Sequence, residues 1–129
     1  MKSAVLVIDV QAGLFPDDDL PADFGPVIAN INELTSKARR GSVPVIFIQH
    51  ETAGGLLVAG TEGWKLHKDL VCEDSDIIVG KTTPDSFLRT DLEVKLLSLR
   101  VDNLIVCGYA SEFCVDTTVR RGAALGFPV

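Results

Sequence analysis

Three side chains of different chemistry stand at the ends of predicted elements in this 129-residue chain. Cys114 lies three positions after Ser111, a residue type that caps helices, so its thiol is predicted in the first turn of a helix. The positive end of a helix lowers the pKa of a thiol and favours the nucleophilic thiolate. Asp9 follows five aliphatic residues, and Lys81 follows another apolar segment. Together they would supply a nucleophile, a base and a cation.

Each of these residues also has a purely structural interpretation. A free cysteine is most often a small core residue, an aspartate at a strand end often caps a turn, and a lysine is usually solvated. A buried carboxylate needs a partner, however, and Lys81 is the natural cation for Asp9. Cys107 lies within an aliphatic strand, and Cys72 lies beside two acidic residues that would raise its pKa. Cys114 is therefore the candidate nucleophile.

The apolar pattern predicts elements that would bring these residues together. Four continuous apolar segments indicate buried strands, three segments with 3.6-residue periodicity indicate helices, and residues 90–93 fit a capping box. Strands are predicted at 4–8, 44–48, 76–79 and 104–107, and helices at 27–38, 92–99 and 115–125. This order is typical of an α/β fold, here a three-layer α/β/α domain with a mostly parallel, doubly wound, Rossmann-like sheet. In such sheets ligands bind outside the carboxyl ends of the strands, which is where Asp9, His50 and Lys81 would come together.

Composition excludes several classes of protein. Twelve basic and eighteen acidic residues give a net charge of −6, which argues against binding of nucleic acid. No apolar run approaches the ~20 residues of a membrane span, and we expect no membrane partner. Three widely spaced cysteines suggest no disulfide framework, so a cytoplasmic location is expected. The length fits one domain over residues 1–129.

Three ordered segments resemble the isochorismatase-like cysteine hydrolases, a family that includes nicotinamidases and N-carbamoylsarcosine amidases. The segments are 5–11, Lys81 with 85–87, and 106–118, which runs Val-Cys-Gly-Tyr-Ala-Ser-Glu-Phe-Cys-Val-Asp-Thr-Thr. The resemblance implies a catalytic triad of Asp9, Lys81 and Cys114. It also implies a cis peptide between Tyr109 and Ala110, which would aim the N–H groups of Ala110 and Cys114 at an oxyanion.

Further residues are candidates for contact with a substrate. Gln11 would hydrogen-bond the substrate or tie down the following loop, and His50 would contact substrate or be a structural histidine. The aromatic candidates would wall the pocket or simply plug the core. The complete set is Gln11, Phe15, His50, Trp64, Phe87 and Tyr109.

No metal or other cofactor is expected. Nicotinamidases carry a metal site built on an Asp-x-His segment, whereas residues 47–51 contain no aspartate, and His67 is the only other histidine. A zinc or iron site needs three or more converging ligands. The resemblance, without a metal site, implies metal-independent, cysteine-dependent hydrolysis of a C–N bond in a small amide through a thioester as the favoured function. The alternatives are hydrolysis of the isochorismate vinyl ether and a non-catalytic binding or assembly protein.

The last residues, 126–129, resemble the opening of a fifth strand. Relatives continue through this strand into further sheet and helix, so the C-terminal portion of the family fold is expected to be missing from this chain. An uncovered sheet edge favours association, and a homo-oligomer, a dimer or larger, is expected.

Overall fold

The computed structural model describes residues 1–129, which form one four-stranded parallel sheet. The strands are β1 (Ser3–Ile8), β2 (Val45–His50), β3 (Ile77–Lys81) and β4 (Asn103–Gly108). Their order across the sheet is β3-β2-β1-β4, and all three neighbouring pairs are parallel. The first strand therefore lies inside the sheet, with β2 and β4 on its two sides.

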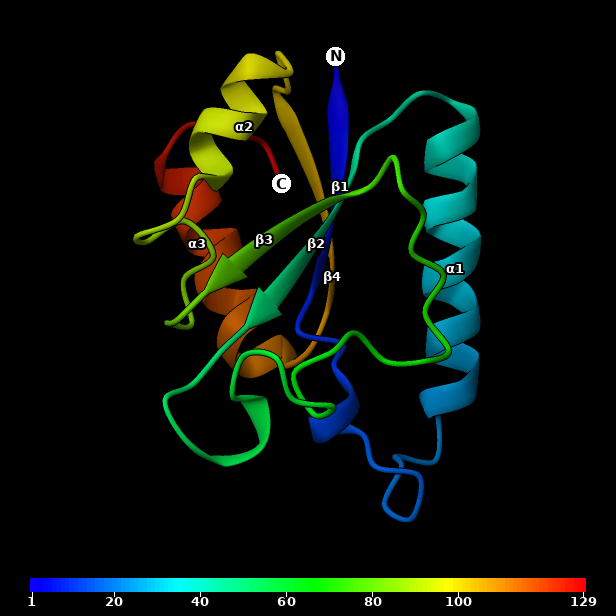
Figure 1. Ribbon diagram of the computed structural model, residues 1–129. Helices are drawn as coiled ribbons and strands as arrows, with labels where there is room; N and C mark the ends of the chain where they lie inside the picture. The colour runs from blue at the N-terminus through cyan, green and yellow to red at the C-terminus, as the bar shows by residue number, and fades with distance from the viewer.

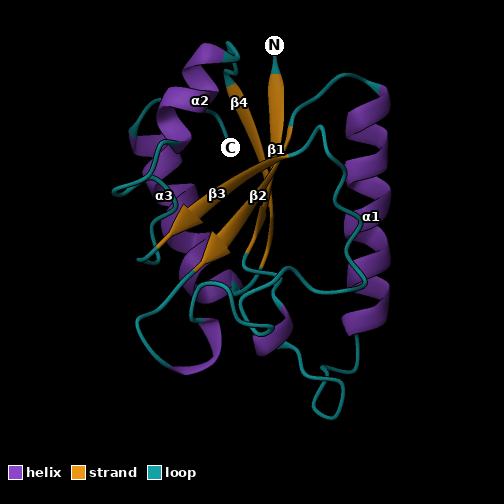
Figure 2. Cartoon of the chain, in the orientation of Figure 1, coloured by secondary structure: helices purple, strands orange, loops and turns teal.

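Helices cover both faces of this sheet (Figure 1). The helix α1 (Phe24–Arg40) lies on one side, and α2 (Leu92–Ser98) and α3 (Asp116–Ala124) lie on the other. Figure 2 shows the sheet enclosed between these two helical layers. The predicted three-layer α/β/α fold with a parallel sheet is confirmed. None of the helices has the length and apolar character that crossing a membrane requires.

The continuous apolar run of β1 is explained by burial on both faces. Successive side chains of a strand point to opposite faces. Val5 and Val7 belong to the core cluster under α1, whereas Leu6 and Ile8 belong to the cluster under α2 and α3. All four are at most 1% exposed. Both clusters continue through β2, which makes the middle of the sheet the centre of the core.

The predicted caps of two helices differ from the structure. The helix α2 begins after Asp91, so Thr90 lies one residue before the cap position; its hydroxyl accepts a hydrogen bond from the Leu92 N–H and donates to the Ser86 carbonyl. The third helix is entered through a π-helical turn, Ser111–Val115, that follows Ala110, and Ser111 makes no capping hydrogen bond. In that turn the N–H groups of Phe113 and Val115 both donate to the Ala110 carbonyl. A backbone carbonyl thus accepts hydrogen bonds where a capping side chain was expected.

The segments beyond these elements also differ from the prediction. Residues 126–129 form no strand; the Pro128 carbonyl accepts one hydrogen bond from Leu104, and a proline has no N–H to extend a ladder. The long irregular loop at 51–70 is present, and a short 3-10 turn (Gly55–Leu57) interrupts it. It continues along α1, where Asn32 bonds the backbone of Asp69 and Val71 on the way to β3.

Candidate active site

The register of the sheet brings three polar residues to one edge. Ile8 pairs with Ile48, and His50 pairs directly with Lys81. Asp9 follows Ile8, and its backbone N–H bonds the Ile48 carbonyl while its φ angle is +55°. Aspartate is among the few residue types that adopt this left-handed conformation readily. The strands β2 and β3 run two residues further than predicted, so His50 and Lys81 are the last residues of strands and do not follow them.

Lys81 is the centre of this group. Its side chain has no exposed surface, and its Nζ lies 3.1 Å from Oδ2 of Asp9, whose side chain is 4% exposed. The same Nζ donates to the Thr83 carbonyl at 3.0 Å and lies 2.7 Å from Nδ1 of His50. A buried ion pair with its remaining hydrogen-bond capacity filled is the arrangement that a charged lysine needs away from water.

The thiol of Cys114 completes the cluster. Lys81 Nζ lies 3.5 Å from its Sγ, and the residue is 8% exposed. Burial, and next the carboxylate of Asp9, raise the pKa of this thiol to about 11, although the Lys81 ammonium acts in the opposite direction. The expected preformed thiolate is therefore wrong, because desolvation outweighs the nearby cation.

Two polar groups of this region make no hydrogen bond within the chain. Oδ1 of Asp9 is buried and has no hydrogen-bond partner. The N–H of Ala110 donates no hydrogen bond within the chain, and the Tyr109–Ala110 peptide is cis. Buried polar groups in folded proteins are normally paired. The unpaired Oδ1 of Asp9 could therefore receive a proton, and the unpaired N–H of Ala110, four residues before Cys114, could hold an oxygen of a bound molecule.

Gln11 is a structural tether. It is fully buried; its Nε2 donates to the carbonyls of His50 and Trp64, and its Oε1 accepts from the His50 N–H. Gln49 also donates to the Trp64 carbonyl. Both donor hydrogens of Gln11 are used, so the second interpretation of this residue, fixing the following loop, agrees with the structure. Trp64 enters this network through its backbone and is itself half-buried.

The aromatic candidates lie in different environments. Phe87 is in the core under α3 and stacks on Phe127 with ring centroids 6.2 Å apart, which agrees with the second interpretation of this residue, an aromatic that plugs the core. Phe15 packs edge-on against Tyr109 at 4.9 Å, and both line a cavity of about 300 Å³ together with apolar residues of α1. These two remain candidates for substrate contact, and Tyr109 is 44% exposed.

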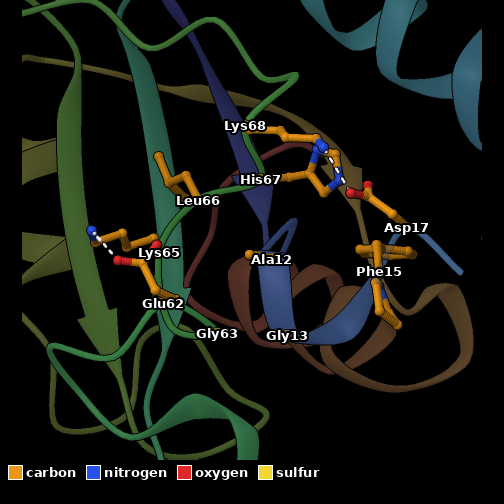
Figure 3. Close-up of a pocket in the computed structure, with 11 residues that line it drawn as sticks. Ala12, Gly13, Phe15, Asp17, Glu62, Gly63, Lys65, Leu66, His67 and Lys68 are labelled. Atoms are coloured by element: carbon orange, nitrogen blue, oxygen red, sulfur yellow. Dashed lines mark hydrogen bonds and ion pairs between the residues drawn. The ribbon is translucent and has the colours of Figure 1, made fainter.

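A larger cavity of about 530 Å³ lies between the first turn after β1 and the long loop (Figure 3). Gly13 and Gly63 lie on its two walls, and exposed ion pairs join Lys68 to Asp17 and Lys65 to Glu62 at its rim. None of the three predicted catalytic side chains lines it. Its rim charges are already paired with one another.

One functional contact escaped the sequence prediction. Thr83 offers its carbonyl to Lys81, a role that any residue type could fill and that no side-chain pattern would reveal. No three His, Cys, Asp or Glu side chains converge in a way that could hold a metal ion. His67 lies in the α1 layer, where Phe24 packs edge-on against its ring and its Nδ1 accepts from the Asp69 N–H.

Comparison with known proteins identifies the family. A model of the isochorismatase domain matches residues 3–129. The chain belongs to the isochorismatase family. A crystal structure of an isochorismatase family protein superposes with a TM-score of 0.90 at 32% identity, covering 97% of this chain and 74% of the other. The resemblance carried by the three sequence segments is thus confirmed.

Relatives of the isochorismatase family with named activities are hydrolases. Streptothricin hydrolase of Streptomyces noursei is 33% identical over 98% of this chain and 46% of its own length. Ureidoacrylate amidohydrolase RutB of Pseudomonas syringae pv. syringae is 29% identical over 98% of this chain and 66% of its own. The uncharacterized family protein YddQ of Bacillus subtilis (strain 168) is 34% identical over 98% and 73%. The chain therefore spans about half to three quarters of these relatives' lengths.

Proposed function

We propose that this isochorismatase-family chain carries the active site of a cysteine hydrolase that cleaves the C–N bond of a small amide. The observation that carries the proposal is the buried cluster of Asp9, Lys81 and Cys114, with the unpaired N–H of Ala110 four residues before the cysteine. A base, a cation, a nucleophile and an oxyanion donor are the parts that acyl transfer requires. The amidohydrolase among the relatives supports the amide as the substrate class.

The first half of the reaction forms a thioester. Sγ of Cys114 attacks the amide carbonyl carbon as Asp9 takes the thiol proton on its unpaired Oδ1. A C–S bond forms and the carbonyl oxygen becomes an oxyanion, which the N–H groups of Ala110 and Cys114 hold. One such donor typically contributes about 3 kcal/mol to stabilisation of the transition state. Asp9 then gives the proton to the nitrogen, the C–N bond breaks, and ammonia or an amine leaves.

The second half of the reaction restores the enzyme. Asp9, again a carboxylate, removes a proton from a water molecule, and the oxygen of that water attacks the thioester carbonyl. The C–S bond breaks, the acid product leaves, and Cys114 regains its proton. The Lys81 ammonium stays charged throughout, because it neutralises Asp9 in one state and the sulfur in the other.

Turnover of an amide panel tests the proposal. Small primary amides and ureido compounds are incubated with the protein, and released ammonia is measured. Acid-quenched samples are analysed by mass spectrometry for an acyl adduct on the protein. Cys114→Ala should abolish turnover and the adduct, whereas Cys107→Ala, a matched variant of a partly buried cysteine, should keep both. Turnover by Cys114→Ala at the wild-type rate would remove the nucleophile. A wild-type protein that releases ammonia from no member of the panel contradicts the amide as the substrate class.

The state of the cysteines supports a reducing, cytoplasmic setting for this activity. All three thiols are free, and Cys72 is exposed. Exposed free thiols are rare in proteins of oxidising compartments, because such thiols pair or oxidise there. Localisation of a tagged protein by cell fractionation would test this part of the proposal.

A further inference from the structure

His50 touches the proposed catalytic cluster through one atom. Its Nδ1 lies 2.7 Å from Lys81 Nζ, the shortest contact that this ammonium makes. The two residues are direct partners in the parallel pair of β2 and β3, so both side chains leave the same face of the sheet. Gln11 holds the backbone of His50 at both its N–H and its carbonyl. The backbone of His50 is therefore fixed by Gln11, and its imidazole contacts Lys81.

The proton count of this contact decides which form of His50 fits. A lysine ammonium has three donors and no acceptor capacity. Its three shortest contacts are Nδ1 of His50, the Thr83 carbonyl and Oδ2 of Asp9. An ammonium that donates to Nδ1 requires that this nitrogen carry no proton. The imidazole is then neutral, with its hydrogen on Nε2.

We propose that His50 is a positioning residue of this site, whose neutral imidazole accepts a hydrogen bond from Lys81 and holds the ammonium between Asp9 and Cys114. The inference rests on the proposed function for its catalytic consequence and on the geometry alone for the contact. A proton on Nδ1 would face the ammonium at 2.7 Å, and the two cations would separate. Protonation of His50 therefore moves Lys81 away from the carboxylate and the thiol and switches the site off.

The charged surroundings agree with a neutral imidazole at neutral pH. Burial and the adjacent Lys81 ammonium lower the pKa of His50, while the carboxylates of Asp9 and Glu51 act in the opposite direction. These are the ionisable groups that act on the ring: Asp9 directly after β1, Lys81 at the end of β3, and Glu51, its neighbour in the chain. Because the pKa is lowered, the neutral form is complete above the ordinary histidine range and is lost only as the pH falls below it.

Nitrogen NMR tests the contact without any substrate. The chain has two histidines, so ¹⁵N-histidine labelling gives two sets of ring signals, and His67→Asn assigns them. We expect His50 to show a protonated Nε2 and an unprotonated, hydrogen-bonded Nδ1. Lys81→Met should raise the pKa of His50 and leave that of His67 in place. A proton on Nδ1 in the wild-type protein at pH 8 would overturn the proposal, whether or not Lys81→Met folds.

The pH profile of turnover tests the consequence. An asparagine places an uncharged oxygen acceptor near the position of Nδ1, whereas a leucine places none. We expect His50→Leu to lose about tenfold or more in turnover at pH 8, the loss typical of a removed hydrogen bond to a charged group. The turnover of His50→Asn at pH 8 should stay within several-fold of wild type. This variant should also lose the acid limb of the profile, which is the fall in turnover at low pH that protonation of His50 causes. His67→Asn, whose ring lies away from the cluster, should keep that limb.

The outcomes separate this inference from the proposed function. If the wild-type protein turns over no amide and forms no acyl adduct, the proposed function fails while the NMR result still decides the contact. If turnover occurs and both His50 variants keep the rate and the acid limb of wild type, the positioning role fails alone. If His50→Asn is as slow as His50→Leu, the acceptor atom is not what matters, and the proposal is overturned as well.

Discussion

Replacement of Lys81 by methionine is the sharpest test of the buried cluster as a structural unit. Methionine keeps the length and the apolar stem of lysine and removes only the ammonium. The Asp9 carboxylate, 3% exposed, would then lose its one ion-pair partner, and its Oδ1 already has none. Removing one partner of a buried pair typically costs about 3–5 kcal/mol, because an uncompensated charge stays behind. This is a large part of the ~5–15 kcal/mol that stabilises a typical domain.

A second ion pair in the same chain provides the matched control. Lys68 and Asp17 are joined at 2.8 Å, a shorter contact than the 3.1 Å of the buried pair, but both side chains are largely exposed. Exposed pairs contribute little because water solvates each partner alone. Lys68→Met should therefore leave the urea midpoint where it is, while Lys81→Met moves it to clearly lower urea.

The double variant isolates the charge from the other effects of the substitution. Asp9→Asn combined with Lys81→Met leaves no charge in this cluster, so it should be more stable than Lys81→Met alone. The assay is equilibrium urea unfolding followed by circular dichroism, with the slope of each transition checked for two-state behaviour. The reasoning is refuted if Lys81→Met unfolds at the same midpoint as Lys68→Met, or if the double variant loses the sum of the two single losses.

Two further predictions concern the thiol and the turn before it. Because burial and Asp9 raise the pKa of Cys114 to about 11, iodoacetamide labelling should accelerate about tenfold per pH unit with no plateau below about pH 10, read by mass spectrometry; a plateau near pH 8 contradicts the buried thiol. Gly108→Ala should lower the free energy of unfolding by more than about 1 kcal/mol, because φ is +121° and a Cβ would collide with the backbone of Ile8. Gly25→Ala, which meets nothing, is its control in thermal unfolding and should show no loss.

The fold could be predicted from the sequence because its strands are buried on both faces. A run such as residues 4–8 has no polar position, and at strand length that pattern is typical of a parallel sheet covered on both faces. The carboxyl ends of β2 and β3 escaped prediction for the opposite reason. Gln49, His50 and Lys81 are polar, yet their backbones continue the ladder because their side chains find buried partners. Because these residues are polar, the predicted strands stopped before them. The same polarity made His50 and Lys81 candidate site residues.

The site was predicted in composition and mistaken in its electrostatics. The rule that ligands bind at the carboxyl ends of parallel strands places Asp9 and Lys81 at the same edge of the sheet without any coordinates. The protonation state of Cys114 depends on how far water is excluded, and only packing decides that. Likewise, the fully used amide of Gln11 and the core position of Phe87 follow from which neighbours surround them. Sequence spacing carries no signal for these contacts.

The high pKa of Cys114 is compatible with the proposed mechanism once the charge of the whole cluster is counted. At rest, Asp9 carries one negative charge and Lys81 one positive charge, and the thiol and His50 are neutral. Loss of the thiol proton to solvent would leave a net negative charge in a buried place, which is the process that burial opposes. Transfer of the same proton to Asp9 leaves the net charge of the cluster at zero, because the carboxyl becomes neutral as the sulfur becomes negative. Lys81, which contacts both, then pairs with the sulfur instead of the carboxylate. The nucleophile is thus made at the moment of attack, and a variant that blocks Asp9 as acceptor, Asp9→Asn, should lose acyl-adduct formation while its Cys114 thiol still labels at high pH.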